Sequence, residues 1–402
     1  LGAARFRGDR GPLGISLPKS RSPLSEALIE ACAAFGMRRV EDVNDPAPQE
    51  RAGYAQWTIK AGKRQSAATA FLKPIMNRPN LTVVKNVVID KVVFEERRAV
   101  GVTGVQNGNL VSFEADKEII VCAGAIASPA ILQRSGIGPT ALLSENGIQT
   151  VRVNASVGAN LHEHRGIVMQ WKTEDSYSEN RDYRGLNLLA SAAQYFLFKK
   201  GPMTKAAFDI GGWFKSRPEL ERPDAQVLLS PFSFDYTSES PRVEDSGGVI
   251  CCIYMLRPEC SGSVAIRSAD PAVFPKIDAN YRSADKDARF MVDLVRHARK
   301  LMSQASLAEF GLEETRPGSQ FETDQELHEA YRQMGYTNYH ACGTCRMGDD
   351  PDSVLDPSLR VRGVSNLRVV DASIFPFMPA GNSNAPVMAA AWRAAEIIKS
   401  GA

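Results

Sequence analysis

Residues 118–138 constrain the possible folds of this 402-residue chain more than any other stretch. Residues 118–122 form a short apolar run, which is typical of a buried strand in a parallel sheet. Gly124 then predicts a turn, and the Ser-Pro pair 128–129 predicts the start of a helix over residues 130–134. Small residues let a cofactor approach the backbone, and free N–H groups at a helix start bind anions such as pyrophosphate. Any strand-to-helix turn can have this pattern, so a purely structural role stays open on the residues alone.

The composition is that of an ordinary globular chain, and it narrows the possible partners. Hydrophobic residues make up 44% and charged residues 23%, which is ample material for a core. The length predicts about two or three domains. The 48 basic and 46 acidic residues nearly cancel, so charge gives no support for nucleic acid or an anionic membrane surface as a partner. No apolar run reaches about eighteen residues, so we predict no membrane span.

The N-terminal residues 1–5 contain neither an initiating Met nor a signal-peptide pattern, so we expect the chain to be part of something longer. The seven cysteines are few and odd in number, and most lie in apolar runs, which favours buried free thiols. These features predict a cytoplasmic protein. A periplasmic or secreted protein stays open because the native N-terminus is absent.

Hydrophobic spacing predicts several helices and strands. A helix is expected over residues 24–35, capped by Ser22, and a second over residues 67–72. The final helix, residues 386–399, is apolar on several sides and is expected to be largely buried. Residues 165–335 alternate β-like runs with a long amphipathic segment, which predicts an α+β module. The β-branched runs predicted as strands are residues 80–84, 87–94, 99–105, 226–229, 249–255 and 263–266.

The segment 339–348 contains His340, one of only five histidines. A histidine can take up a proton near neutral pH, so His340 is a candidate general base. Downstream, residues 369–373 predict a strand that ends in Asp-Ala-Ser and could seat a cofactor before a helix. Residues 382–386 follow and contain Asn384, whose amide can hold a reacting oxygen by hydrogen bonds.

Three rival patterns carry less weight. Cys342 and Cys345 have the Cys-x-x-Cys spacing, but no βαβ pattern precedes them and no second ligand pair follows, so we predict neither a redox nor a metal site. His162 and His164 could ligate a metal but are more simply loop residues. Residues 136–141 match G-x-G-x-x-A, but they follow a helix rather than a strand and contain a proline.

The order of these motifs resembles that of one known family. Residues 124–138 match one of its signatures, and residues 157–164 match its Val-Gly-x-Asn-Leu-x-Asp-His segment, with Glu163 where Asp is usual. The further matching segments are residues 62–67, 71–74, 78–81, 262–264, 268–271, 280–281, 340–348 and 382–386. The chain therefore resembles the glucose-methanol-choline (GMC) flavin oxidoreductases, in particular the branch similar to choline dehydrogenases and alcohol oxidases.

The resemblance implies a two-part fold. We expect an α/β flavin-binding domain, Rossmann-like and of the glutathione-reductase type, together with an α+β substrate domain built on an antiparallel sheet. The flavin domain would comprise residues 56–164 and 336–402, the second of which carries the catalytic residues. The substrate domain would comprise mainly residues 1–55 and 165–335.

The resemblance also implies the chemistry. An enzyme of this kind uses FAD to oxidise a small-molecule alcohol to an aldehyde or ketone. His340 would remove the hydroxyl proton while the α-carbon passes hydride to flavin N5, and Asn384 would orient the alkoxide. The expected electron acceptor is O2 or a quinone or dye. No metal is implied.

Cofactor contacts follow from the same motif positions. Gly124 and Ala125 are expected near the diphosphate, and Asp371 and Ala372 near the ribityl and pyrimidine end. Val88 is expected near the adenine. The remaining residues predicted to contact the cofactor are Asn382, Ala385 and Pro386.

Two other functions stay open. A hydroxynitrile lyase of the same fold would bind flavin without using it for redox chemistry. A non-catalytic fragment or subunit is the second alternative, because no strand followed by G-x-G-x-x-G occurs in the chain, although the family has that fingerprint. We expect the missing flavin-domain segment as a separate chain or as a further region of the same protein.

Overall fold

The chain folds into two compact units, each assembled from separated segments of the sequence. The computed structural model describes residue 3 and residues 7–19, 21–46, 49–237, 240–281 and 284–401. Unit 1 comprises Leu1–Thr82, Arg165–Leu256 and Ala288–Tyr336, and unit 2 comprises Val83–His164, Arg257–Asp287 and Thr337–Ala402. Residues 56–82, grouped with the flavin domain on sequence, cluster with unit 1, and residues 257–287 cluster with unit 2.

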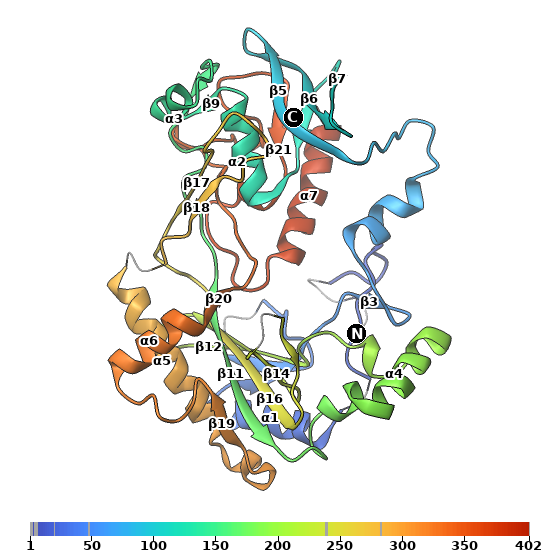
Figure 1. Ribbon diagram of the computed structural model, residues 1–402, viewed down its shortest axis with the longest axis vertical. Coiled ribbons are helices and arrows are strands. Elements are labelled where there is room, and N and C mark those ends of the chain that lie inside the picture. The colour runs from blue at the N-terminus through green and yellow to red at the C-terminus, as the bar shows by residue number, and fades with distance from the viewer. Residues whose placement is uncertain are drawn as a thin grey trace. The chain divides into compact units, whose positions relative to one another are not determined.

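Unit 1 is built on a mainly antiparallel sheet (Figure 1). Within the described residues this sheet has eight strands. The strand order is β1 (Arg38–Arg39), β2 (Arg51–Tyr54), β12 (Ile210–Phe214), β13 (Ala225–Ser230), β16 (Gly247–Met255), β11 (Arg165–Thr173) and β19 (Glu313–Arg316), with β20 (Gly335–Thr337) also paired to β11. The β1–β2 pair is parallel, and the successive pairs from β2 to β19 are antiparallel. The predicted antiparallel sheet is therefore confirmed.

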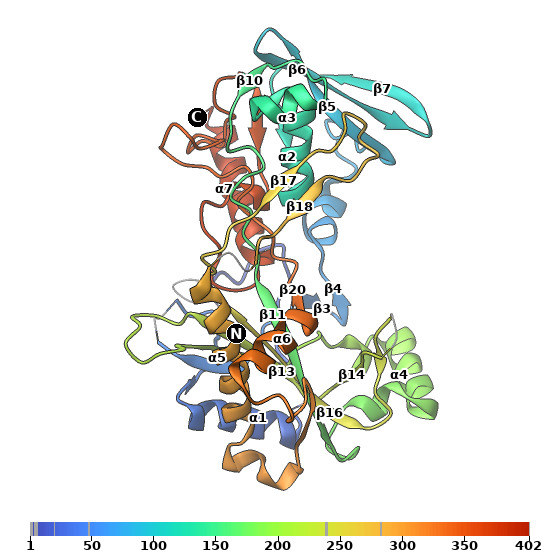
Figure 2. The ribbon, with the colours of Figure 1, turned by 60° about the vertical axis from the view of Figure 1, so that its left-hand side comes forward.

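Side-chain alternation gives this sheet two buried faces. In β16, Ile253 belongs to the large core cluster, whereas the next residue, Tyr254, belongs to a smaller cluster on the other face. The large cluster includes side chains of α1 (Pro23–Phe35) and α5 (Asp285–Met302), which Figure 2 shows on one side of the sheet. Leu28 of α1 is fully buried there. As predicted, Ser22 caps α1, accepting a hydrogen bond from the backbone of the third helical residue.

The smaller elements of unit 1 lie around this sheet. The helices are α4 (Gly185–Phe198) and α6 (Asp324–Met334), and the short strands are β3 (Ile59–Lys60), β4 (Lys63–Arg64), β14 (Phe234–Asp235) and β15 (Arg242–Val243). The predicted second helix at residues 67–72 is present as one π-helical turn, Ala68–Leu72, followed by a 3-10 turn, Lys73–Ile75.

Unit 2 combines a parallel strand pair with an antiparallel meander. The pair is β8 (Ile119–Val121) with β21 (Leu367–Val369), and the meander runs through β5 (Val87–Glu95), β6 (Arg98–Gln106) and β7 (Asn109–Glu114). The helices are α2 (Gly124–Arg134), α3 (Thr140–Glu145) and α7 (Asn384–Lys399). The remaining strands are β9 (Ile137–Gly138), β10 (Arg152–Val153), β17 (Ser263–Ala265) and β18 (Lys276–Asp278).

Helix α2 is the centre of unit 2. It packs on β5 and β17, and both views show the β17–β18 pair beside it (Figures 1 and 2). Leu132 of α2 is fully buried, in one cluster with Val369 of β21. The parallel β8–β21 pair and the helix that follows β8 agree with the α/β class predicted for the flavin domain.

The predicted start of helix α2 was wrong. The helix begins at Gly124, not after Ser128, so Pro129 lies inside it. Pro129 has no N–H for the carbonyl of Ala125, four residues earlier. The buried hydroxyl of Thr344 donates to that carbonyl instead, at 2.6 Å. A tertiary hydrogen bond thus replaces the missing helical one, which local sequence could not predict.

Two further predictions were wrong because burial and strand pairing depend on neighbours. Residues 80–84 form no strand: Val84 is 48% exposed, and none of the described strands pairs with this stretch. Helix α7, all of whose residues the structure describes, buries Ala394 alone, and its Trp392 is 56% exposed. Its apolar composition therefore did not predict its burial. Among the described helices, none is both long enough and apolar enough to span a bilayer.

Candidate active site

The side chain of His340 lies in a buried cluster in unit 2. Its Nδ1 is 3.0 Å from Nδ1 of His164, and its Nε2 is 3.2 Å from Nδ2 of Asn382. His164 is fully buried and His340 is 8% exposed. Because an amide Nδ2 donates, Nε2 of His340 accepts, and the imidazole then carries its hydrogen on Nδ1. The His340 tautomer therefore keeps its basic lone pair on Nε2.

Burial also keeps this imidazole neutral. It lowers the pKa of His340 from 6.5 to about 4. At neutral pH the ring is therefore unprotonated, which a proton acceptor requires. The chain thus provides a neutral base whose orientation is fixed at both nitrogens.

Two stretches far apart in the sequence hold this cluster together. The backbone N–H groups of His162 and Cys342 each donate to the other residue's carbonyl, at 3.0 and 2.9 Å. Both the backbone N–H and the side-chain amide of Asn338 donate to the carbonyl of His164 at 3.0 Å. Residues 160–164 and 337–343 therefore lie side by side, and this places the rings of His164 and His340 in contact.

The structure brings Asn382, rather than Asn384, to His340. From the sequence, Asn384 was expected beside His340 to orient the alkoxide, and Asn382 was expected to contact the cofactor. Both asparagines are exposed, but Asn384 is the first residue of α7, whereas Asn382 lies before the helix, after Gly381 with φ +144°. Both asparagines belong to one N-x-N motif, so spacing gave no signal to separate them.

Asp371 links the end of β21 to the start of α2. One carboxylate oxygen accepts from the backbone N–H of Gly124 at 2.9 Å and from the hydroxyl of Ser128 at 2.5 Å. The other accepts from the backbone N–H of Ser373 at 2.7 Å. The structure therefore brings Asp371 and Ala372 together with Gly124 and the first turn of α2, as expected if they share a ligand.

The catalytic segment runs along the same junction. The backbone N–H groups of Gly343, Cys345 and Met347 donate to the carbonyls of residues 372–374 at 3.3, 2.9 and 2.8 Å. His340 and the predicted diphosphate residues are thus parts of one connected region of unit 2.

The predicted cofactor residues offer room for a large ligand. Gly124 has φ +85°, and a Cβ added there would meet nothing within 4 Å. Ala385 at the start of α7 is exposed, and Val88 is 56% exposed on β5. Open space at a glycine beside a helix N-terminus suits a diphosphate, and the accessible start of α7 leaves room for a planar ring system. The residues present therefore fit a dinucleotide cofactor.

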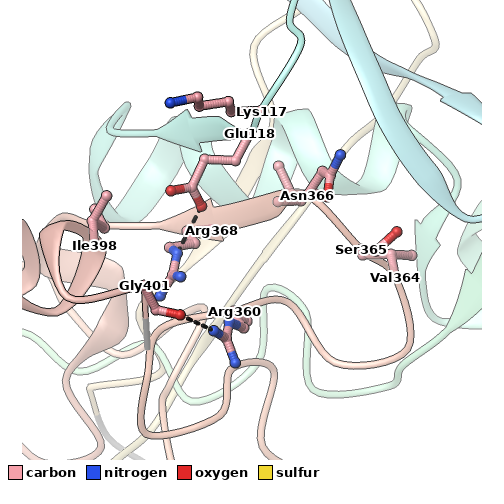
Figure 3. A pocket seen from close by; sticks show the side chains of 10 residues that line it. Lys117, Glu118, Arg360, Val364, Ser365, Asn366, Arg368, Ile398 and Gly401 are labelled. Atoms are coloured by element: carbon pink, nitrogen blue, oxygen red, sulfur yellow. Dashed lines mark hydrogen bonds and ion pairs between the residues drawn. The ribbon is translucent and has the colours of Figure 1, made fainter.

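A cavity of about 450 Å³ lies elsewhere in unit 2 (Figure 3). Its lining includes Lys117, Glu118 and Asn366, which precede strands β8 and β21, and an ion pair of 2.7 Å joins Glu118 to Arg368. Asp371 and the start of α2 follow the same strands. In open α/β sheets ligands bind beyond the carboxyl ends of the strands. This cavity is therefore not the candidate cofactor site. No group of side chains suited to a metal occurs in the described ranges.

Comparisons with known proteins point to one family. The two models described as GMC oxidoreductase match residues 3–166 and 258–391. Choline dehydrogenase, mitochondrial, of Homo sapiens is 37% identical over 401 residues, which cover 99% of this chain and 67% of that protein. Oxygen-dependent choline dehydrogenase of Escherichia coli (strain K12 / DH10B) is 35% identical over 403 residues, covering 99% and 72%.

Solved structures agree. A crystal structure of formate oxidase aligns with a TM-score of 0.90 and 27% identity over 98% of this chain and 73% of that chain. Pyridoxine 4-oxidase from Mesorbium loti aligns with a TM-score of 0.82 and 27% identity, covering 97% and 72%. The predicted family and fold class are confirmed.

Proposed function

Because this chain belongs to the GMC oxidoreductases, FAD-dependent enzymes that act on CH–OH donors, we propose that His340 is the base that removes the hydroxyl proton of an alcohol substrate. The observation that carries the proposal is the environment of His340. Its Nδ1 is engaged by His164, and its Nε2 faces the Asn382 amide. Burial lowers the pKa of the ring to about 4, so the ring is neutral at the pH of most cells.

The proton transfer follows from this geometry. A substrate hydroxyl donates to Nε2 of His340, in the place where the Asn382 amide now donates. The same amide then donates to the substrate oxygen and stabilises the negative charge that develops there. When Nε2 takes the proton, the Nδ1–H of the imidazolium donates to Nδ1 of His164, which stabilises the positive charge.

The carbon half of the reaction needs an electron acceptor. Bound FAD supplies it, because it accepts the hydride that leaves the alcohol carbon as the carbonyl forms. We propose that Gly124 and Ala125 bind its diphosphate and that the start of α7, with Ala385 and Pro386, lies against its ring system. Asp371, with Ala372, holds the start of α2 in place for this contact. Val88 on β5 would contact the adenine.

We retain the domain assignment as part of the proposal. Residues 56–164 and 336–402 would form the FAD-binding domain, and residues 1–55 and 165–335 mainly the substrate domain. The junction of β8, α2 and β21 supports the first assignment, because it provides the strand-to-helix turn that a dinucleotide needs.

Absorbance measurements under anaerobic conditions test the function. The relatives named above suggest choline and pyridoxine as first substrates. We expect an alcohol substrate to bleach the flavin absorbance of the loaded protein in a single turnover. A hydroxynitrile lyase would leave the flavin oxidised while it cleaved a cyanohydrin, and a non-catalytic subunit would do neither. Reoxidation by O2, compared with reoxidation by a quinone, then identifies the acceptor.

A further inference from the structure

The carboxylate of Glu163 is buried beside the catalytic segment, yet no basic side chain of the described ranges forms an ion pair with it. Glu163 is 8% exposed. Its two oxygens accept from the backbone N–H of His340 at 2.9 and 3.1 Å, and one also accepts from the hydroxyl of Thr337 at 2.9 Å. A buried charge is costly unless it is hydrogen-bonded. Hydrogen bonds from the catalytic segment offset part of the cost of burying the Glu163 carboxylate, and burial still holds its pKa above the usual value.

These contacts close a tight turn in the main chain. The hydroxyl of Thr337 donates to Glu163 and accepts from the backbone N–H of Tyr339 at 3.1 Å. Tyr339 has φ +61°, a left-handed conformation that non-glycine residues adopt only when their surroundings hold them. Glu163 thus accepts hydrogen bonds from both sides of the strained residue, from Thr337 before it and from His340 after it.

Glu163 and its neighbour His164 hold His340 at two different points. The Glu163 carboxylate binds the main chain of His340, and the His164 ring binds its side chain at Nδ1. Fixing the N–H fixes the Cα position, and fixing Nδ1 fixes the rotation of the ring. With both fixed, Nε2 can point in one direction, which is the direction of Asn382.

We propose that Glu163 is a positioning residue for His340: it holds the main chain at residues 337–340 so that the imidazole presents Nε2 to the substrate. This inference rests on the proposed role of His340 as the base. Glu163 touches neither substrate nor flavin in this account. Its carboxylate acts only through the conformation of the catalytic segment. Burial raises the pKa of this carboxyl, and the hydrogen bonds from His340 and Thr337 act against that rise.

The test uses the FAD-loaded protein with Glu163→Gln, which keeps the size of the side chain but removes its charge. In glutamine one of the two carboxylate oxygens is replaced by the amide Nε2, which donates and cannot accept, so the side chain faces the His340 N–H with one acceptor oxygen instead of two. Glu163→Asp is the rescue variant, because it keeps the carboxylate. Glu314→Gln is the matched control, since Glu314 is also a buried carboxylate but pairs with Arg299 in unit 1 at 2.8 Å.

Two quantities are measured: the single-turnover rate of flavin reduction and the 15N NMR signals of labelled histidines. We expect Glu163→Gln to slow reduction by up to about 100-fold, with FAD still bound, because small misplacements of a reacting group have effects of this size. The His340 signals, assigned by their loss in His340→Gln, should move, while those of His297 in unit 1 should not. Glu163→Asp should recover part of the rate, and Glu314→Gln should change neither quantity.

Unchanged His340 signals and an unchanged rate in Glu163→Gln would overturn the inference. If that variant does not fold, Thr337→Val takes its place, because it removes one donor to Glu163. His340 signals identical to wild type in Thr337→Val would then overturn the inference.

The proposed base and the proposed positioning role can be refuted separately. If flavin is reduced at the normal rate in His340→Ala, His340 is not the base. If flavin reduction is slow in His340→Ala but normal in Glu163→Gln, only the positioning role of Glu163 is refuted.

Discussion

The Nδ1 atoms of His164 and His340 lie 3.0 Å apart, and the two ring planes are nearly perpendicular, at 88°. At this distance one nitrogen donates and the other accepts, so a single hydrogen lies between them. With Nε2 of His340 accepting from Asn382, that hydrogen belongs to His340. The pair therefore fixes which nitrogen of His340 can act as a base.

This arrangement predicts an acid-shifted pH profile. Because burial lowers the pKa of His340 to about 4, the fraction of free enzyme with a neutral ring stays constant from neutral pH down to about pH 5. Below about pH 4 the rate of flavin reduction at low substrate should fall about tenfold per pH unit. Stopped-flow measurements of reduction against pH check this. An inflection near 6.5, the ordinary pKa of histidine, would contradict the burial argument.

The same shift has a consequence for stability. The folded-state pKa of His340 lies below the unfolded value of 6.5, so as pH falls the unfolded chain binds the proton first. The stability contribution is fully present above 6.5 and is lost as pH falls through about 4. Urea unfolding at several pH values should therefore show a smaller loss of stability in His340→Gln than in wild type. Equal losses of unfolding free energy in the two proteins would mean that the His340 imidazole does not contribute to the pH dependence of stability.

The two asparagines of the N-x-N motif can be separated by mutation. Asn382→Ala removes the amide 3.2 Å from Nε2 of His340 and should slow flavin reduction by about 100-fold, the usual effect of losing a donor to a developing oxyanion. Asn384→Ala is the matched control, because Asn384 is the first residue of α7, whereas the amide beside Nε2 of His340 belongs to Asn382. Its rate should fall much less. If Asn384→Ala is the slower variant, the assignment from sequence was correct and the one from geometry is not.

Asp371 should support cofactor binding through the start of α2. Asp371→Ala leaves the backbone N–H groups of Gly124 and Ser373 without their acceptor, and the N–H of the fully buried Ser373 left unpaired costs about 1–3 kcal/mol. We expect a lower thermal midpoint and a purified protein with less bound FAD. Asp350→Ala removes an exposed carboxylate in the same unit and serves as control. Retention of FAD at wild-type occupancy in Asp371→Ala would argue against this role.

Thr344 should stabilise helix α2 only because Pro129 is present. Thr344→Val removes the hydroxyl that donates to the Ala125 carbonyl and should lower the free energy of unfolding by about 1–3 kcal/mol. In a Pro129→Ala background the N–H of residue 129 can bond that carbonyl, so the same change should cost less. Urea unfolding of the four proteins gives the coupling energy. Equal costs in both backgrounds would show that the two residues act independently.

Helices and strands were predicted correctly from the sequence where local residue type and spacing determine them. The Ser22 cap and the helix after it, and strands β13 and β16, follow from residue type and spacing. Motif order also pointed to His340 and Asp371, and the structure places both in unit 2. These features depend on residues that are close in sequence or on motifs whose residues have a fixed, recognisable spacing.

The remaining features depend on contacts between distant residues. Helix α2 continues through Pro129 because Thr344 bonds the carbonyl that the proline leaves free. The choice of Asn382 over Asn384 depends on where α7 begins, and the exposure of α7 depends on which elements pack against it. The role of Glu163 depends on a main-chain N–H far along the sequence. None of these contacts has a local signal.

The proposed transfer of the substrate proton to His340 is tested most directly by one measurement. His340→Ala and wild type, both loaded with FAD, are mixed anaerobically with the same alcohol, and flavin reduction is followed by absorbance. The account predicts that the variant binds FAD normally and is reduced about 100- to 10,000-fold more slowly, the range for loss of a general base. Reduction of His340→Ala at the wild-type rate would contradict it.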